Sequence, residues 1–139
     1  MTVQHGTAPS ITAFIDAHMP FLRTGRAAVA DALRADDERG NAFLVLEQPP
    51  LRWRFAREKG GLSLELQPVE CRRRWYSVDL IRRLFTGQRE RSGQLDGAYA
   101  AFLGEHLAEL ETLFSPEQWP DTERRLDELR KTRSRELFG

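Results

Sequence analysis

The chain has 139 residues, of which 40% are hydrophobic and 30% are charged, and this balance excludes an intrinsically disordered protein. Its 21 basic residues equal its 21 acidic residues, which excludes a globally basic surface of the kind that adheres to any polyanion. The single cysteine, Cys71, excludes an internal disulfide.

Length and composition favour one domain over residues 1–139 with a single hydrophobic core. Residues 1–7 lack the basic and apolar regions of a secretory signal. No later stretch approaches the roughly 18 apolar residues that a membrane span needs. We therefore expect a protein that stays in the cytoplasm and does not enter a membrane.

The N-terminal part of the chain predicts a helical segment. Ser10 is typical of an N-cap. The positions that follow have the spacing of one helix face: Ile11, Phe14, Ile15 and His18. Pro20 and Gly25 predict a break. A second helical run is expected from Arg26 to Gly40, with an apolar side at Ala27, Val29, Ala30 and Leu33.

From residue 43 the hydrophobic period changes to that of a strand. Residues 43–47 are mostly aliphatic, and the run ends at Pro49 and Pro50, which cannot donate to a sheet. The next two runs alternate, with apolar positions at Leu51, Trp53 and Phe55 and then at Leu62, Leu64 and Leu66. Gly60 and Gly61 predict a hairpin turn between them. We expect a three-stranded antiparallel meander with one apolar face.

The hairpin register follows from the position of its turn. It predicts that Phe55 faces Leu64 and that Trp53 faces Leu66. On the polar face, Arg54 lies opposite Glu65, a cross-strand ion pair that contributes on the order of 0.2 to 1 kcal/mol. Helices are expected to cover the apolar face.

Helices are expected after the sheet. Ser77 and Gly87 bound a short helix. A long amphipathic helix has its apolar side at Leu95, Tyr99, Phe102, Leu103, Leu107, Leu110 and Phe114. Ser115 and Pro116 predict the start of a final helix. The predicted fold class is therefore α+β, with an N-terminal helical segment, a three-stranded antiparallel sheet, and C-terminal helices packed on one sheet face.

The residues that could support catalysis or metal binding form no recognisable motif. His106 and Glu109 have the i, i+3 spacing of a metal pair, but no second pair accompanies them. His18 lies on an apolar helix face, which is typical of a core histidine. Cys71 precedes three arginines, which favours its thiolate, yet no histidine lies nearby in sequence. We predict a protein that is not an enzyme, with no catalytic residues, no metal and no cofactor.

Basic residues concentrate in the middle of the chain. Between Arg52 and Arg91 there are 11 Lys or Arg and 5 Asp or Glu, and arginine and tryptophan are the types richest in binding hot spots. The candidate partner-binding residues are Arg52, Arg54, Arg57, Arg72, Arg73, Arg74, Trp75, Arg82 and Arg83. Arg57 would point to the apolar side unless the strand ends before it.

A purely structural interpretation stays open beside this one. In it, Trp53 and Trp75 belong to the core, and the arginines only pair with the acidic final helices. Nucleic acid is one candidate partner for the segment from Arg52 to Arg91, because an exposed tryptophan can stack on bases. The sequence pI of 6.8 and the acidic C-terminal part favour a protein partner with a mixed-charge surface instead.

Three stretches carry a resemblance to a known class of proteins: LRWRFAREKGGLSLELQPV, WYSVDLIRRLFTG and FLGEHLAELETLFSPEQWPDTERRLDELRKTRSRELFG. Over about residues 41–139 the chain resembles the small bacterial immunity proteins of polymorphic and contact-dependent toxin systems. The resemblance implies a non-catalytic protein that binds a cognate toxin in the cytoplasm and blocks it. We expect the chain to be a monomer or a homodimer. It implies no particular toxin activity.

Overall fold

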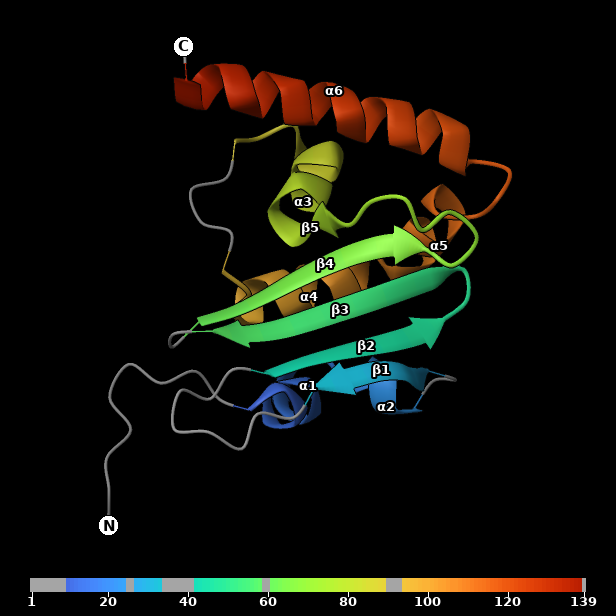
Figure 1. Cartoon of the computed structure of the whole chain (residues 1–139), viewed down its shortest axis with the longest axis vertical. Helices are drawn as coiled ribbons and strands as arrows, with labels where there is room; N and C mark the ends of the chain where they lie inside the picture. Colours follow the sequence, from blue (N-terminus) through green and yellow to red (C-terminus); the bar gives the residue numbers. More distant parts are fainter. Residues whose placement is uncertain (1–9, 25–26, 34–41, 59–60, 90–93, 139) are drawn as a thin grey trace.

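The computed structural model describes residues 10–24, 27–33, 42–58, 61–89 and 94–138. Its helices and strands confirm the predicted α+β class (Figure 1). In chain order they are α1 (Ile11–His18), α2 (Phe21–Thr24), β1 (Ala28–Leu33), β2 (Ala42–Gln48), β3 (Leu51–Glu58), β4 (Gly61–Pro68), β5 (Tyr76–Ser77), α3 (Val78–Thr86), α4 (Gly97–Glu105), α5 (Leu107–Leu113) and α6 (Trp119–Phe138).

The sheet has five strands in the order β1-β2-β3-β4-β5, with every neighbouring pair antiparallel. The three predicted strands are β2, β3 and β4. The expectation of only three strands was wrong, because β1 and the two-residue β5 extend the sheet at its two edges.

The N-terminal helical segment is confirmed only as far as α2. Residues 28–33 were expected in a helix and instead form β1, which pairs with β2 from Ala28 opposite Glu47 to Leu33 opposite Phe43. Alanine favours a helix locally, but pairing with the edge of β2 satisfies the same backbone groups and overrides that preference. The predicted ends of this run, Arg26 and Gly40, lie outside the described residues.

The β3–β4 register is the predicted one. Phe55 lies opposite Leu64, Trp53 opposite Leu66, and Arg54 opposite Glu65. Because opposite residues of antiparallel strands share a face and side chains alternate along each strand, the register defines an apolar inner face and a second, outer face. The outer face carries Phe43, Val45, Glu47, Arg52, Arg54, Ala56, Ser63, Glu65 and Gln67.

The described helices leave the outer face uncovered. In Figure 1 the strands lie in front of α4 and α5, while α3 follows β5 at the sheet edge and α6 packs beyond α3. Helix α1 contacts β2, β3 and α4. Helices α1, α4 and α5 therefore cover the inner face, as the alternation in β3 and β4 predicts.

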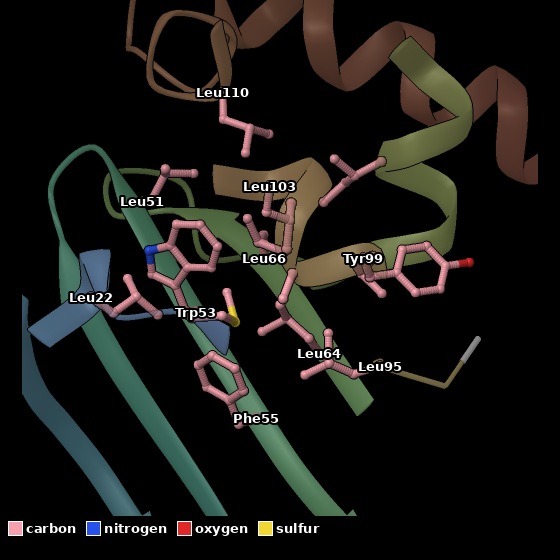
Figure 2. Close-up of a cluster of buried hydrophobic side chains, with 14 of the residues drawn as sticks. Leu22, Leu51, Trp53, Phe55, Leu64, Leu66, Leu95, Tyr99, Leu103 and Leu110 are labelled. Carbon is pink, nitrogen blue, oxygen red and sulfur yellow. The ribbon is translucent and has the colours of Figure 1, made fainter. Parts of the chain in front are cut away.

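The core lies between the inner face and these helices. Figure 2 shows Trp53 and Phe55 of β3 together with Leu64 and Leu66 of β4, packed toward Leu103 of α4. Trp53 is fully buried, so the first of the two tryptophans belongs to the core. Helix α1 adds Phe14, Ile15 and, after its end, Met19.

The C-terminal helices differ from the prediction in their boundaries. The long helix is two helices, because the backbone at His106 departs from helical geometry (φ −108°, ψ 19°) between α4 and α5. The final helix starts at Trp119, because residues 115–118 first form a turn in which the Ser115 carbonyl accepts from the Gln118 and Trp119 amides. Pro120 lies in the first turn of α6, where its missing N–H removes no intrahelical bond. The short helix α3 matches its predicted limits, Ser77 and Gly87.

Within the described ranges, no helix has the length and apolar character needed to cross a bilayer.

Candidate protein-binding surface

An aromatic ring in contact with two guanidinium groups marks the outer face of the sheet. Arg52 and Arg54 are two residues apart on β3 and therefore project from the same face. The guanidinium carbons lie 5.3 Å (Arg52) and 5.9 Å (Arg54) from the centre of the Trp75 ring. Arg54 also lies 6.0 Å from the ring of Phe43 on β2. These distances are within the range of cation–π attraction, so the four side chains form a continuous row.

A partly buried hydrogen-bond network lies beside Trp75. Gln67 of β4 is only 1% exposed. Its Oε1 accepts a 2.6 Å hydrogen bond from Arg52 Nη1, and its Nε2 donates a 2.9 Å bond to the Arg74 carbonyl. Arg52 Nε donates to Glu47 Oε2 at 2.9 Å. Because the Gln67 amide is satisfied at both ends, it constrains the loop before β5 at the residue that precedes Trp75.

Arg54 and Arg72 are the exposed cations of this surface. The Arg54 side chain is 41% exposed and has one long contact, 3.4 Å from Nη1 to Glu65 Oε1. The Arg72 side chain is 52% exposed. Its Nε donates to the Val69 carbonyl at 2.9 Å, and its Nη2 lies 3.6 Å from Glu47. Both side chains are partly exposed, so a carboxylate of a partner could accept hydrogen bonds from their guanidinium groups.

Three of the other predicted arginines pair with acidic residues of α6. Arg73 Nη2 donates to both Glu123 oxygens at 2.9 and 3.0 Å. Arg83 forms a bidentate pair with Glu136 in which both distances are 2.9 Å. Arg74 Nη1 lies 3.8 Å from Asp127. These contacts dock α6 against α3 and the loop before β5, so their first role is structural.

The two remaining predicted residues lie away from the outer face. Strand β3 continues to Glu58, and Arg57 pairs with Leu62, so Arg57 shares the inner parity of Phe55. Arg82 of α3 stacks over the rings of Tyr99 and Phe102 of α4, at 5.8 and 5.6 Å. The nine candidates therefore do not converge on one patch.

We define the Trp75 surface as the part of the outer face and the adjoining loop that carries Phe43, Glu47, Arg52, Arg54, Glu65, Gln67, Arg72 and Trp75. Sequence reasoning identified its arginines and its tryptophan but not Phe43, Glu47 or Gln67. For Gln67, the alternation of apolar and polar residues in β4 contained a signal, since Gln67 has the same strand parity as Glu65. Residues 42–46 of β2 are all apolar, so no alternation marked Phe43.

The residues considered for catalysis lie at separate places. His106 Nδ1 is 2.9 Å from Glu109 Oε1 within α5 and its N-cap. The His18 ring packs against Phe14 with 4.7 Å between ring centres. Cys71 Sγ accepts a 3.4 Å hydrogen bond from Arg73 Nε. Among the described residues, no three His, Cys, Asp or Glu side chains gather in a way that could hold a metal ion.

Comparison of the chain with protein-family models, with curated proteins and with solved structures gives no match.

Proposed function

We propose that the chain is a protein-binding module that binds and neutralises a cognate bacterial toxin in the cytoplasm, without catalysis of its own. The observation that carries the proposal is the contact of the Trp75 ring with Arg52 and Arg54 on a sheet face that the described helices leave uncovered. The resemblance of residues 41–139 to small bacterial immunity proteins supplies the toxin as the partner class.

The Trp75 surface has the composition of a binding hot spot. Tryptophan and arginine dominate such centres, where a rigid aromatic ring excludes water around charged hydrogen bonds. Gln67 accepts a hydrogen bond from Arg52 and donates one to the Arg74 carbonyl, so the backbone next to Trp75 is ordered before any partner arrives. Little side-chain entropy is then lost on binding, which favours affinity.

The charges of the Trp75 surface favour a protein over a nucleic acid. Arg52 and Arg72 both approach Glu47, and Arg54 approaches Glu65. Each cation thus has a carboxylate within its own surface, and these carboxylates repel phosphate. A partner protein whose surface carries both basic and acidic side chains can replace these internal ion pairs with ion pairs across the interface, so that every charge keeps an opposite charge beside it.

A survival assay tests the function directly. The open reading frame encoded just upstream is expressed with and without this chain, and surviving cells are counted. We expect the upstream reading frame to be toxic when it is expressed alone, and we expect cells to survive when this chain is co-expressed. The two proteins are then expected to copurify as a complex of fixed stoichiometry. Absence of toxicity together with absence of a complex refutes the immunity function.

Site variants connect survival to the Trp75 surface. W75A and R54A are expected to weaken the complex by at least about tenfold each, as truncation of a hot-spot residue does. W75F, which retains an aromatic face, is expected to retain most of the affinity. R124A removes an exposed arginine of α6 and serves as the matched control. Far-ultraviolet circular dichroism verifies that each variant is folded.

Nucleic-acid binding is the competing outcome of the same experiments. It predicts retention on heparin and an affinity for single-stranded DNA that falls linearly with the logarithm of salt concentration. A salt-sensitive DNA complex that W75A abolishes, without rescue of toxicity, would replace the proposed function with that alternative.

A further inference from the structure

A groove of about 500 Å³ lies at one end of the sheet. The β2–β3 turn, the loop after β4 and the α5–α6 connection meet there, and Figure 1 shows these segments together at one end of the molecule. Its walls include Pro49, Pro50, Pro68, Pro116, Trp119 and Pro120. Proline has no backbone N–H, so these walls offer few donors and favour an apolar occupant. We refer to it as the proline groove.

The opposite end of α6 presents an unpaired apolar surface. The buried residues of α6 are Trp119, Thr122 and Leu126, all near its start. At its last turn, Leu137 is 62% exposed and Phe138 is 85% exposed. Among the described residues, only Val29 is a comparably exposed large hydrophobic. The two side chains are neighbours in the chain, so they form one exposed apolar site at the end of α6.

The two features cannot meet within one chain. Helix α6 has 20 residues and is therefore about 30 Å long, with the groove at its start and Leu137 and Phe138 at its end. A second copy related by a two-fold axis, with the two α6 helices antiparallel, brings each helix end to the partner's groove. Both contacts then form at once, and the assembly closes as a dimer.

Charges at the two ends are complementary. Glu70 forms part of the groove wall, and Glu117 directly follows Pro116; both are exposed. Lys131 and Arg135 are exposed on α6 and share one helix face with Phe138, at i, i+4 and i+7. An apolar helix end with two cations is therefore complementary to an apolar groove with one carboxylate in its wall and a second, Glu117, next in sequence to a wall residue.

We propose that the chain forms a two-fold symmetric homodimer in which Leu137 and Phe138 of each copy occupy the proline groove of the other. Lys131 and Arg135 pair with Glu70 and Glu117 across the interface. The Trp75 surface takes no part in these contacts, so the inference does not depend on the proposed function.

Sedimentation velocity and light scattering over a wide concentration range test the dimer. The unaltered chain is expected to show a monomer–dimer equilibrium. L137S/F138S is expected to raise the dimer dissociation constant by at least about tenfold, because both symmetric contacts lose their apolar anchors. V29S removes the other exposed hydrophobic, on β1, and is expected to leave the equilibrium unchanged.

A charge exchange identifies which surfaces meet. K131E/R135E gives an acidic helix end, and E70K/E117K gives a basic groove, so each variant alone is expected to be monomeric. In a mixture, the acidic end of the first meets the basic groove of the second, and the two unaltered surfaces also match. A one-to-one heterodimer is therefore expected to form.

Three results of the sedimentation and light-scattering measurements overturn the inference. The first is a monomer at every concentration, and the second is a dimer that L137S/F138S leaves unchanged. The third is an open series of larger assemblies, which would mean that the contact does not close about a two-fold axis. Failure of the mixed variants to associate, while the unaltered chain dimerises, assigns the interface to other surfaces and equally overturns it.

Discussion

The Tyr76 hydroxyl donates a 3.0 Å hydrogen bond to Oδ1 of Asp127, a residue 51 positions later in the chain. Tyr76 belongs to the edge strand β5 and pairs with Leu66 of β4, while Asp127 lies on α6. This bond therefore joins the sheet to the final helix. Arg74 lies 3.8 Å from the same carboxylate oxygen, so the joint sits beside the loop that carries Trp75.

Replacement of Tyr76 by phenylalanine tests this joint. Y76F retains the ring but removes the donor to Asp127, and we expect the free energy of unfolding to fall by about 1 to 2 kcal/mol. Urea denaturation followed by circular dichroism measures the change. D127N retains a hydrogen-bond acceptor, so its free energy of unfolding is expected to fall by less than that of D127A. A Y76F chain as stable as the unaltered one contradicts the structural role of this bond.

Alkaline pH tests the same hydroxyl by another route. Burial raises the pKa of Tyr76 above its ordinary value, and the hydrogen bond to Asp127 raises it further. Because the folded-state pKa exceeds the unfolded value of about 10, the stabilisation is fully present below pH 10 and is lost as pH rises through the folded value. The difference in unfolding free energy between the unaltered chain and Y76F is therefore expected to shrink above about pH 10. A constant difference there would contradict this assignment.

Acid pH tests the contact between α3 and α6. The hydrogen bond from Arg83 lowers the pKa of Glu136, against an opposing effect of burial, and the nearby charges of Arg83 and Arg89 lower it further. A lowered folded-state pKa contributes stability that is present above the unfolded value of about 4.3 and is lost as pH falls through the folded value. E136Q is expected to be less stable than the unaltered chain at neutral pH. The difference in unfolding free energy between the two is expected to narrow below about pH 4.

A double-mutant cycle with R83M provides the control for the acid experiment. The coupling free energy between positions 83 and 136 is expected to fall toward zero over the same acidic range. A coupling that persists unchanged at low pH would show that charge does not hold the end of α6.

Gly87 ends α3 in the left-handed region, with φ 74°, and its amide donates a 2.7 Å hydrogen bond to the Arg83 carbonyl. A Cβ at this position meets no atom within 4 Å, so the cost of a substitution comes from the backbone conformation alone. G87A is expected to lower the free energy of unfolding by about 1 kcal/mol, and G87N by less, because asparagine tolerates this region better. Thermal unfolding distinguishes the two, and equal stability of G87A and the unaltered chain would contradict the argument.

Local chemistry determined several elements of this protein. Strict alternation of apolar and polar residues on both sides of a glycine turn is compatible with one hairpin register. The positions of Phe55 opposite Leu64 and of Arg54 opposite Glu65 could therefore be predicted. Ser10 and Gly87 bounded helices by the same local means, since a cap depends only on neighbouring backbone groups. Residues 28–33 were mispredicted because pairing with β2 outweighs the local helix preference of alanine.

Tertiary structure alone decided how the arginines are used. The sequence placed them in one basic segment and determined their strand parity, which assigned Arg52 and Arg54 to the outer face. It did not determine that α6 would bring Glu123 to Arg73 and Glu136 to Arg83, residues 50 and 53 positions apart. The reason is physical: a strand's parity is a property of its own backbone, whereas an ion pair between distant segments exists only after the whole chain has packed.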